Sequence, residues 1–176
     1  GTIEIHYQLF PIQDLAFRTI LMFESRLEKR NITLEGLDSE PVQVWGDPDL
    51  IGQVIYNLFE NATKFVNTGG TITFTFKDEP NSTSIAIRNT GAGISKEELP
   101  KIFERFYKSD DSRSHDKTGL GIGLDITKHI VRLHKAQISV SSEEGEYTEF
   151  LIRLPKKDAP AESPTENPEK QPKDAR

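Results

Sequence analysis

The chain has 176 residues, of which 35% are hydrophobic and 28% charged, a balance typical of one globular domain with a polar appendage. Its net charge of -6 disfavours a nucleic-acid partner, because a phosphate backbone is bound by a basic surface. The absence of cysteine excludes disulfides and thiolate zinc sites. The longest apolar run, residues 20–23, is far too short to cross a membrane, and we expect no direct membrane contact in this segment.

The N-terminal part of the chain predicts a strand followed by a helix. The chain begins at Gly1 and not at Met, so we expect a fragment of a longer protein. Alternation of apolar and polar residues over 3–7 is strand spacing, and Pro11 suits the first position of a helix. The apolar face of that helix has the three-to-four spacing of Ile12, Leu15, Ala16, Thr19, Phe23 and Leu27.

A second helix is predicted after two short extended segments at 33–35 and 42–44. Asp47 is a favourable N-cap, and Pro48 behind it suits the first helical turn. The apolar face of this helix comprises Leu50, Ile51, Val54, Leu58, Ala62 and Phe65. Two strands, near 71–77 and 84–89, flank a turn that contains Pro80 and Asn81.

Residues 91–118 have little periodicity, which is typical of an insertion that is either functional or disordered. Ser95 and Glu98 form a short capping box within it, and Phe103 and Phe106 are its large apolar anchors.

The pattern becomes regular again after this insertion. A helix follows over about 120–134, and then strands near 137–142 and 147–154 around a turn at Gly145. This order predicts an α/β (α+β) fold, a two-layer sandwich with helices on one face of a mixed β-sheet.

The C-terminal segment differs from the rest. Residues 156–176 contain no Leu, Ile, Val, Met or aromatic residue, and proline recurs there at every fourth position. Such a segment cannot bury enough apolar surface to offset the entropy of ordering it. We therefore predict a folded domain over 1–155 and a disordered, Pro-rich charged tail over 156–176.

Residues 57–65, NLFENATKF, carry the first chemical pattern. Asn57, Asn61 and Lys64 lie at i, i+4 and i+7, so one helix face presents two amides and an ammonium group. Amide oxygens can ligate Mg²⁺, and a lysine can neutralise phosphate. A solvated polar face would have the same pattern.

Two glycine-rich segments carry the others. Residues 89–94, NTGAGI, follow a predicted strand, and glycines there let a backbone approach a flat ligand, although an ordinary turn would look alike. Residues 118–124, TGLGIGL, precede a helix, where backbone N–H groups bind phosphate. The glycine spacing excludes the dinucleotide fingerprint, and no Gly-Lys-Ser/Thr follows as in a P-loop.

In this order, the three segments resemble the asparagine box and the first and second glycine boxes of histidine-kinase catalytic domains. Residues 102–107, IFERFY, resemble the phenylalanine box of the same family. The resemblance covers about residues 3–155. It implies a Bergerat-type sandwich that holds ATP and Mg²⁺ between the asparagine-box helix and a mobile lid over about 92–118.

The resemblance also implies roles for single residues. Asn61 would be the main Mg²⁺ ligand with Asn57 close to the metal, while Lys64 would contact phosphate and Phe65 would pack near the adenine. Lys108 and Arg113 would be the catalytic cations of the lid. The remaining implied nucleotide contacts are Asn89, Gly91, Gly93, Ile94, Tyr107, Thr118, Gly119, Leu120, Gly121, Gly123 and Leu124.

Two departures from the family pattern have consequences. The first glycine box usually opens with Asp, which accepts a hydrogen bond from adenine, but here it opens with Asn89. Because an amide can present either end, we expect weaker discrimination between adenine and guanine. No histidine of the chain is followed by the Glu/Asp-Leu-Arg pattern of a phosphoacceptor box, so we expect the phosphoacceptor histidine outside this chain.

Relatives with the same ATP pocket include gyrase-type and chaperone ATPases. These generally place a general-base Glu four residues before the metal-binding Asn, whereas this chain has Asn57 there, which favours the histidine kinase interpretation. That interpretation implies the kinase's own dimerisation helices and a response regulator as partners, and a cytoplasmic domain of a membrane-anchored sensor. The alternatives are a nucleotide-sensing pseudokinase and a gyrase- or chaperone-type ATPase.

Overall fold

A computed structural model describes residues 2–103 and 122–160. The elements in chain order are β1(Gln8–Pro11), α1(Ile12–Lys29), β2(Thr33–Glu35), β3(Gln43–Gly46), α2(Pro48–Phe65), β4(Thr71–Asp78), β5(Ser82–Thr90), the short 3-10 helix η1(Leu99–Lys101), α4(Ile122–Leu133), β6(Gln137–Glu143) and β7(Tyr147–Pro155).

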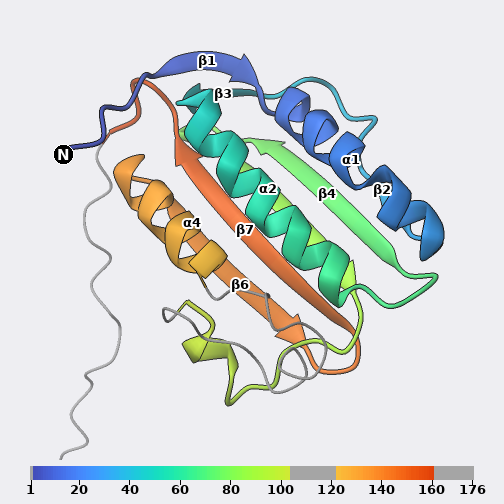
Figure 1. The fold of residues 1–176 in the computed structure, drawn as a ribbon. Coiled ribbons are helices and arrows are strands. Elements are labelled where there is room, and N and C mark those ends of the chain that lie inside the picture. The colour runs from blue at the N-terminus through green and yellow to red at the C-terminus, as the bar shows by residue number, and fades with distance from the viewer. Residues whose placement is uncertain (1, 104–121, 161–176) are drawn as a thin grey trace, which may run out of the picture.

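The main sheet has five strands in the order β2-β4-β5-β7-β6. β2 runs parallel to β4, and the other neighbours are antiparallel. The helices α1, α2 and α4 lie on one face of this sheet (Figure 1). The predicted two-layer α/β sandwich with a mixed sheet is therefore confirmed.

The helix α2 lies between α1 and α4 and packs on the middle of the sheet (Figure 1). Ile55, Leu58 and Phe59 of α2 are almost completely buried. The Phe59 ring lies 5.4 Å from that of Phe23 on α1 and 5.6 Å from that of Phe74 on β4, measured between centroids. This row of rings joins both helices to the sheet and fixes where α2 lies.

The predicted apolar face of α1 agrees fully with the observed burial, and that of α2 only in part, since Leu50 is partly buried and the fully buried Ile55 and Phe59 were not predicted. All six predicted positions of α1 are buried. On α2, Phe65 was predicted to face the core, but its side chain is 45% exposed. The chain leaves the helix after Phe65, and it is Val66, 1% exposed and paired with Gly91, that fills the core there.

The predicted strand over 3–7 is wrong, because the first strand begins at Gln8. A strand needs a partner with free backbone groups, and β3 pairs with 8–11 only, in the register Gln8↔Gly46 to Pro11↔Gln43. Pro11, expected at the first helical position, is instead the last strand residue and the N-cap of α1, so the helix begins one position later, at Ile12. The β1–β3 pair forms a separate two-stranded sheet that the sequence did not predict.

The C-terminal end of the described chain contacts the domain. The Lys156 N–H donates to the Asn81 carbonyl at 3.0 Å, and the Lys157 ammonium lies 4.8 Å from the centroid of the Trp45 ring. Residues 161–176 lie outside the described residues, so the disordered tail stays a prediction.

The N-terminus of α2 is capped by Asp47, as predicted. Asp47 Oδ1 accepts from the N–H groups of Asp49 and Leu50 at 3.0 and 3.2 Å, and Oδ2 accepts from the N–H of His6 at 3.0 Å. Burial alone would raise the pKa of the Asp47 carboxyl, but these backbone donors and the nearby His134 outweigh it and hold that pKa below its ordinary value.

His134, at the end of α4, ties that helix to the same cap. Its side chain is 2% exposed, and its Nε2 accepts from the Asp47 N–H at 3.1 Å. Nδ1 lies 2.8 Å from the Ile130 carbonyl, so Nδ1–H donates to it. His134 is therefore a buried residue that packs α4 against the start of α2.

Replacing Asp47 tests this cap. We expect Asp47→Ala to lower the free energy of unfolding at pH 7 by about 1–2 kcal/mol. The folded pKa lies below the ordinary value of 3.8, so the carboxylate stabilises the fold above that pH, and the contribution is lost as the pH falls through the folded pKa. The difference in unfolding free energy between Asp47→Ala and wild type should therefore shrink in acid. Denaturant titrations at pH 7 and below pH 3.8 measure it.

The matched control is Asp49→Ala, an exposed carboxylate in the same helical turn. Because it loses only an interaction with the helix dipole, its effect should stay below about 0.5 kcal/mol. A pH-independent difference between Asp47→Ala and wild type would contradict the assignment.

Candidate functional site

Asn57 joins the asparagine-box face of α2 to the start of α4. Its Nδ2 donates to the Gly123 carbonyl at 3.2 Å and to Thr127 Oγ1 at 3.4 Å. Because a carbonyl can only accept, the amide NH₂ must face α4, which leaves Oδ1 as the end that can serve a metal or a ligand. The first and third sequence patterns, 66 residues apart at this contact, therefore meet in the fold.

The sequence analysis missed Thr127, whose side chain is fully buried beside Asn57. The signal was present in the sequence. Thr127 lies four residues after Gly123, so both lie on the same face of α4.

Asn61 and Lys64 continue the same face toward the end of α2. Asn61 is partly buried. Lys64 Nζ lies 3.7 Å from Glu60 Oε1, and both side chains are partly exposed, at 26% and 34%. An ion pair with that much solvent contact contributes little to stability.

The first glycine box lies against the end of α2. Gly91 has φ +149°, and a Cβ built on it would lie 2.4 Å from the Phe65 carbonyl oxygen. Gly93 has φ +71°, and its Cβ would lie 2.4 Å from the Glu143 carbonyl oxygen. Both glycines are thus required by close backbone packing, whatever ligand they meet.

Ser142, which the sequence analysis did not single out, holds the same segment. Its Oγ accepts from the Ile94 N–H at 2.7 Å and donates to the Tyr147 carbonyl at 2.6 Å. The first glycine box is therefore anchored to the hairpin of β6 and β7.

Asn89 is 4% exposed, at the end of β5. Its Nδ2 donates to the Thr90 carbonyl at 3.0 Å, and Thr90 Oγ1 donates to Asn67 Oδ1 at 2.6 Å. The carbonyl selects the NH₂ end of the amide, so Oδ1 is the end left for a ligand, as with the family's Asp. Because this amide is held in one orientation, we expect Asn89 to weaken the discrimination between adenine and guanine less than a freely rotating amide would.

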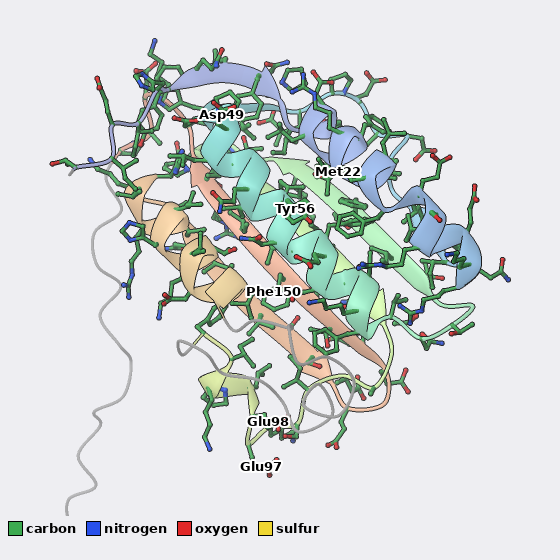
Figure 2. All side chains as sticks on the ribbon, viewed as in Figure 1. Met22, Asp49, Tyr56, Glu97, Glu98 and Phe150 are labelled. Atoms are coloured by element: carbon green, nitrogen blue, oxygen red, sulfur yellow. The ribbon has the colours of Figure 1, made fainter. Side chains whose placement is uncertain are left out.

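The described part of the insertion makes contacts within itself and with the sheet. The Glu98 N–H donates to Ser95 Oγ at 3.3 Å, which is one half of the predicted capping box. Phe103 packs edge-on against Phe150 of β7, with centroids 6.2 Å apart. Figure 2 shows Glu98 far from Asp49, which lies at the start of α2.

Of the remaining predicted site residues, one packs on the core and the others are not described by the structure. Leu124, at the start of α4, is partly buried and packs on the core. Phe106, Tyr107, Lys108, Arg113, Thr118, Gly119, Leu120 and Gly121 lie outside the described residues.

A recess of about 560 Å³ lies between α1 and α2, on the side of α2 that faces away from the contact of Asn57 with α4. Figure 2 labels Met22 and Tyr56 on its two walls. Its lining is Met22, Phe23, Ser25, Arg26, Lys29, Arg30 and Tyr56. None of the predicted nucleotide contacts is among these residues, so the recess is not the candidate nucleotide site.

Among the described residues, no group of three His, Cys, Asp or Glu side chains could hold a metal ion. None of the helices there combines the length and the apolarity that a bilayer span requires.

The family described as "Histidine kinase-, DNA gyrase B-, and HSP90-like ATPase" matches residues 46–158, which include α2, the first glycine box and α4. The chain belongs to this family. Within it, the chain is a histidine kinase catalytic domain, which implies ATP binding.

Sensor kinases are similar to the chain in sequence and in fold. Sensor protein SrrB of Staphylococcus aureus (strain NCTC 8325 / PS 47) is 41% identical over 115 residues, which is 65% of this chain and 20% of SrrB. The catalytic domain of histidine kinase ThkA matches with a TM-score of 0.72 and 27% identity over 86% of this chain and 97% of that domain.

The mycobacterial sensor histidine kinase MprB matches with a TM-score of 0.70 and 26% identity, over 85% of this chain and 97% of that one. ThkA has also been solved in complex with response regulator protein TrrA, and that ThkA chain matches with a TM-score of 0.71. The chain spans about a fifth of the length of SrrB.

Alanine at Gly91 tests the close approach between the first glycine box and α2. Gly91 and Gly145 both have positive φ, so alanine adds backbone strain of about 1–3 kcal/mol at either position. Only Gly91→Ala also forces a Cβ against the Phe65 carbonyl, whereas nothing lies within 4 Å of a Cβ at Gly145. Denaturant titration should show the larger loss of stability for Gly91→Ala, and equal losses would contradict this packing.

Proposed function

We propose that this domain binds Mg-ATP and donates the γ-phosphate to a histidine on a separate dimerisation-helix module of a two-component sensor kinase, which then passes it to a response-regulator aspartate. The observation that supports this most is the hydrogen bond from Asn57 on α2 to the Gly123 carbonyl at the start of α4. It joins the two segments that resemble the metal-binding and phosphate-binding boxes of the family. The complex of ThkA with a response regulator supports the same assignment of partners.

The donor atoms fit a hard cation bound together with phosphates. Asn57 uses its NH₂ group on α4, so its Oδ1 can turn to Mg²⁺, and Asn61 presents a second amide one helical turn later. Mg²⁺, when bound, would neutralise charge on the phosphates of ATP. Because the amides carry no charge, the phosphate oxygens would supply the negative charge that holds the cation.

Other residues of the chain would orient the nucleotide. Asn89 would accept a hydrogen bond from the adenine amino group through Oδ1, since its NH₂ group is held by Thr90. Lys64, and Lys108 and Arg113 of the lid, would neutralise phosphate charge. Phosphoryl transfer requires mainly such positioning and charge neutralisation.

The site carries no general base on α2 at the position that water-activating relatives use. Asn57 occupies it, and an amide cannot take a proton from water. Glu60 is turned about 100° from Asn61 around the helix and is paired with Lys64. This arrangement favours transfer to an acceptor that brings its own base over hydrolysis of ATP.

Removing the Asn61 amide tests the metal site. We expect Asn61→Ala to weaken Mg-ATP binding by at least about tenfold while the melting temperature stays near that of wild type, because Asn61 is only partly buried. The control is Gln53→Ala, an exposed amide two turns earlier on the same helix. Isothermal titration with and without Mg²⁺ measures both variants, and unchanged affinity for Asn61→Ala would place the metal elsewhere.

Labelling with γ-labelled ATP tests the transfer. The chain alone should remain unlabelled, since none of its histidines lies in a phosphoacceptor pattern. A separate dimerisation-helix module with a phosphoacceptor histidine should become labelled when the chain is added. Label on the chain itself would refute the proposal, and an unlabelled module despite Mg-ATP binding would identify a pseudokinase.

A further inference from the structure

The C-terminal end of α2 leaves backbone carbonyls without partners inside the helix, as every α-helix does. Here the side chain of Arg30, the residue that ends α1, supplies the missing donors. Arg30 Nη1 donates to the carbonyl of Thr63, and Nη2 donates to the carbonyl of Val66. One guanidinium therefore holds two points of the chain on either side of Lys64 and Phe65.

The chemistry of this contact suits arginine. A cation is favourable at the C-terminal end of a helix dipole, and a planar fork of donors can hold two carbonyls at once, which a single ammonium group on a flexible stem does less well. Thr63 and Val66 are each 1% exposed, so their carbonyls lie in a part of the fold where few water molecules could replace the donor.

The backbone of Arg30 and its neighbour Arg26 strengthen the same junction. The Arg30 carbonyl accepts from the Gly69 N–H at 2.8 Å, so the turn after α2 is tied to the end of α1 as well. Arg26 Nη1 donates to Thr63 Oγ1 at 3.3 Å. The end of α1 thus sets the position of α2 from Thr63 through the following turn.

This junction lies directly behind the candidate nucleotide site. Lys64 and Phe65 lie between the two held carbonyls, and Val66 pairs with Gly91 in an antiparallel bridge. The carbonyl of Phe65 leaves no room for a Cβ on Gly91. A shift of the last turn of α2 would therefore move both the ammonium group of Lys64 and the backbone of the first glycine box.

We infer that Arg30 is a positioning residue of the nucleotide site: its fork on the Thr63 and Val66 carbonyls holds Lys64, Phe65 and Gly91 at the spacing that Mg-ATP binding requires. Arg30 belongs to neither glycine box nor to the asparagine box, and among the described residues its side chain acts on the site through the backbone at the end of α2. The inference rests on the proposed function, since it assigns a role within Mg-ATP binding.

The test compares Arg30→Met, Arg30→Lys and the control Lys29→Met, which removes an exposed cation from the same end of α1. Mg-ATP affinity is titrated at a temperature where circular dichroism shows every variant folded. We expect Arg30→Met to weaken binding by about tenfold, because misplaced binding groups lose affinity steeply. Arg30→Lys keeps the positive charge but not the two-pronged guanidinium, so its Mg-ATP affinity should lie between those of Arg30→Met and wild type. Lys29→Met should bind Mg-ATP with wild-type affinity.

A residue that only stabilises the fold would behave differently. Arg30→Met would then lower the melting temperature yet bind Mg-ATP with wild-type affinity in its folded state, and that result would overturn the inference. If Arg30→Met does not fold, Arg30→Lys decides, and wild-type affinity in that variant is the contrary outcome. Wild-type protein that fails to bind Mg-ATP would instead refute the proposed function, so the two failures are distinguishable.

Discussion

The rest of the structure depends on how the two ends of α2 satisfy their unpaired backbone groups. At the first end, the Asp47 carboxylate accepts from N–H groups of the opening turn, and the Asp47 N–H itself is held by His134 from the end of α4. At the other end, Arg30 from the end of α1 donates to the carbonyl of Thr63 in the last turn of α2 and to that of Val66, the residue after the helix. Each neighbouring helix therefore contributes a terminal side chain to an end of α2, and the position of α2 in the layer follows.

That position brings together groups that are remote in the sequence. The side chain of Asn57 reaches the start of α4 at Gly123, and the residue after α2, Val66, pairs with Gly91. The row of rings from Phe23 through Phe59 to Phe74 supports α2 between these two contacts, because it packs the helix against both α1 and β4. The hydrogen bonds that stabilise the helix layer are thus also the ones that determine the geometry of the candidate site.

Asn57 shows how closely packing and chemistry are linked in this domain. Its NH₂ group donates to the Gly123 carbonyl, so the position requires a donor. A glutamate there, as in water-activating relatives, would bring a carboxylate against that carbonyl, and two acceptors at such a distance repel. If the domain acts in phosphoryl transfer, as proposed, a change toward hydrolysis would require rearrangement at the start of α4 as well as one substitution.

Much of this protein could be predicted from its sequence, because the relevant patterns are local. The buried face of α1, the cap at Asp47 and the strands on either side of the turn at Pro80 follow from periodicity and from the conformations that single residues prefer. The motif segments are local as well, but they were identified by their resemblance to the boxes of a known family. What the tertiary structure alone decided depends on partners far along the chain.

The first strand lies at 8–11 and not over 3–7 because β3 offers its hydrogen bonds only there. Phe65 is exposed because Val66 takes the core position beside Gly91. The amide of Asn89 is oriented by a neighbouring carbonyl, and Arg30 became part of the site only through backbone groups of α2. A sequence pattern records which conformation and which face a residue prefers, whereas the donors and acceptors that meet it are determined when distant segments pack together.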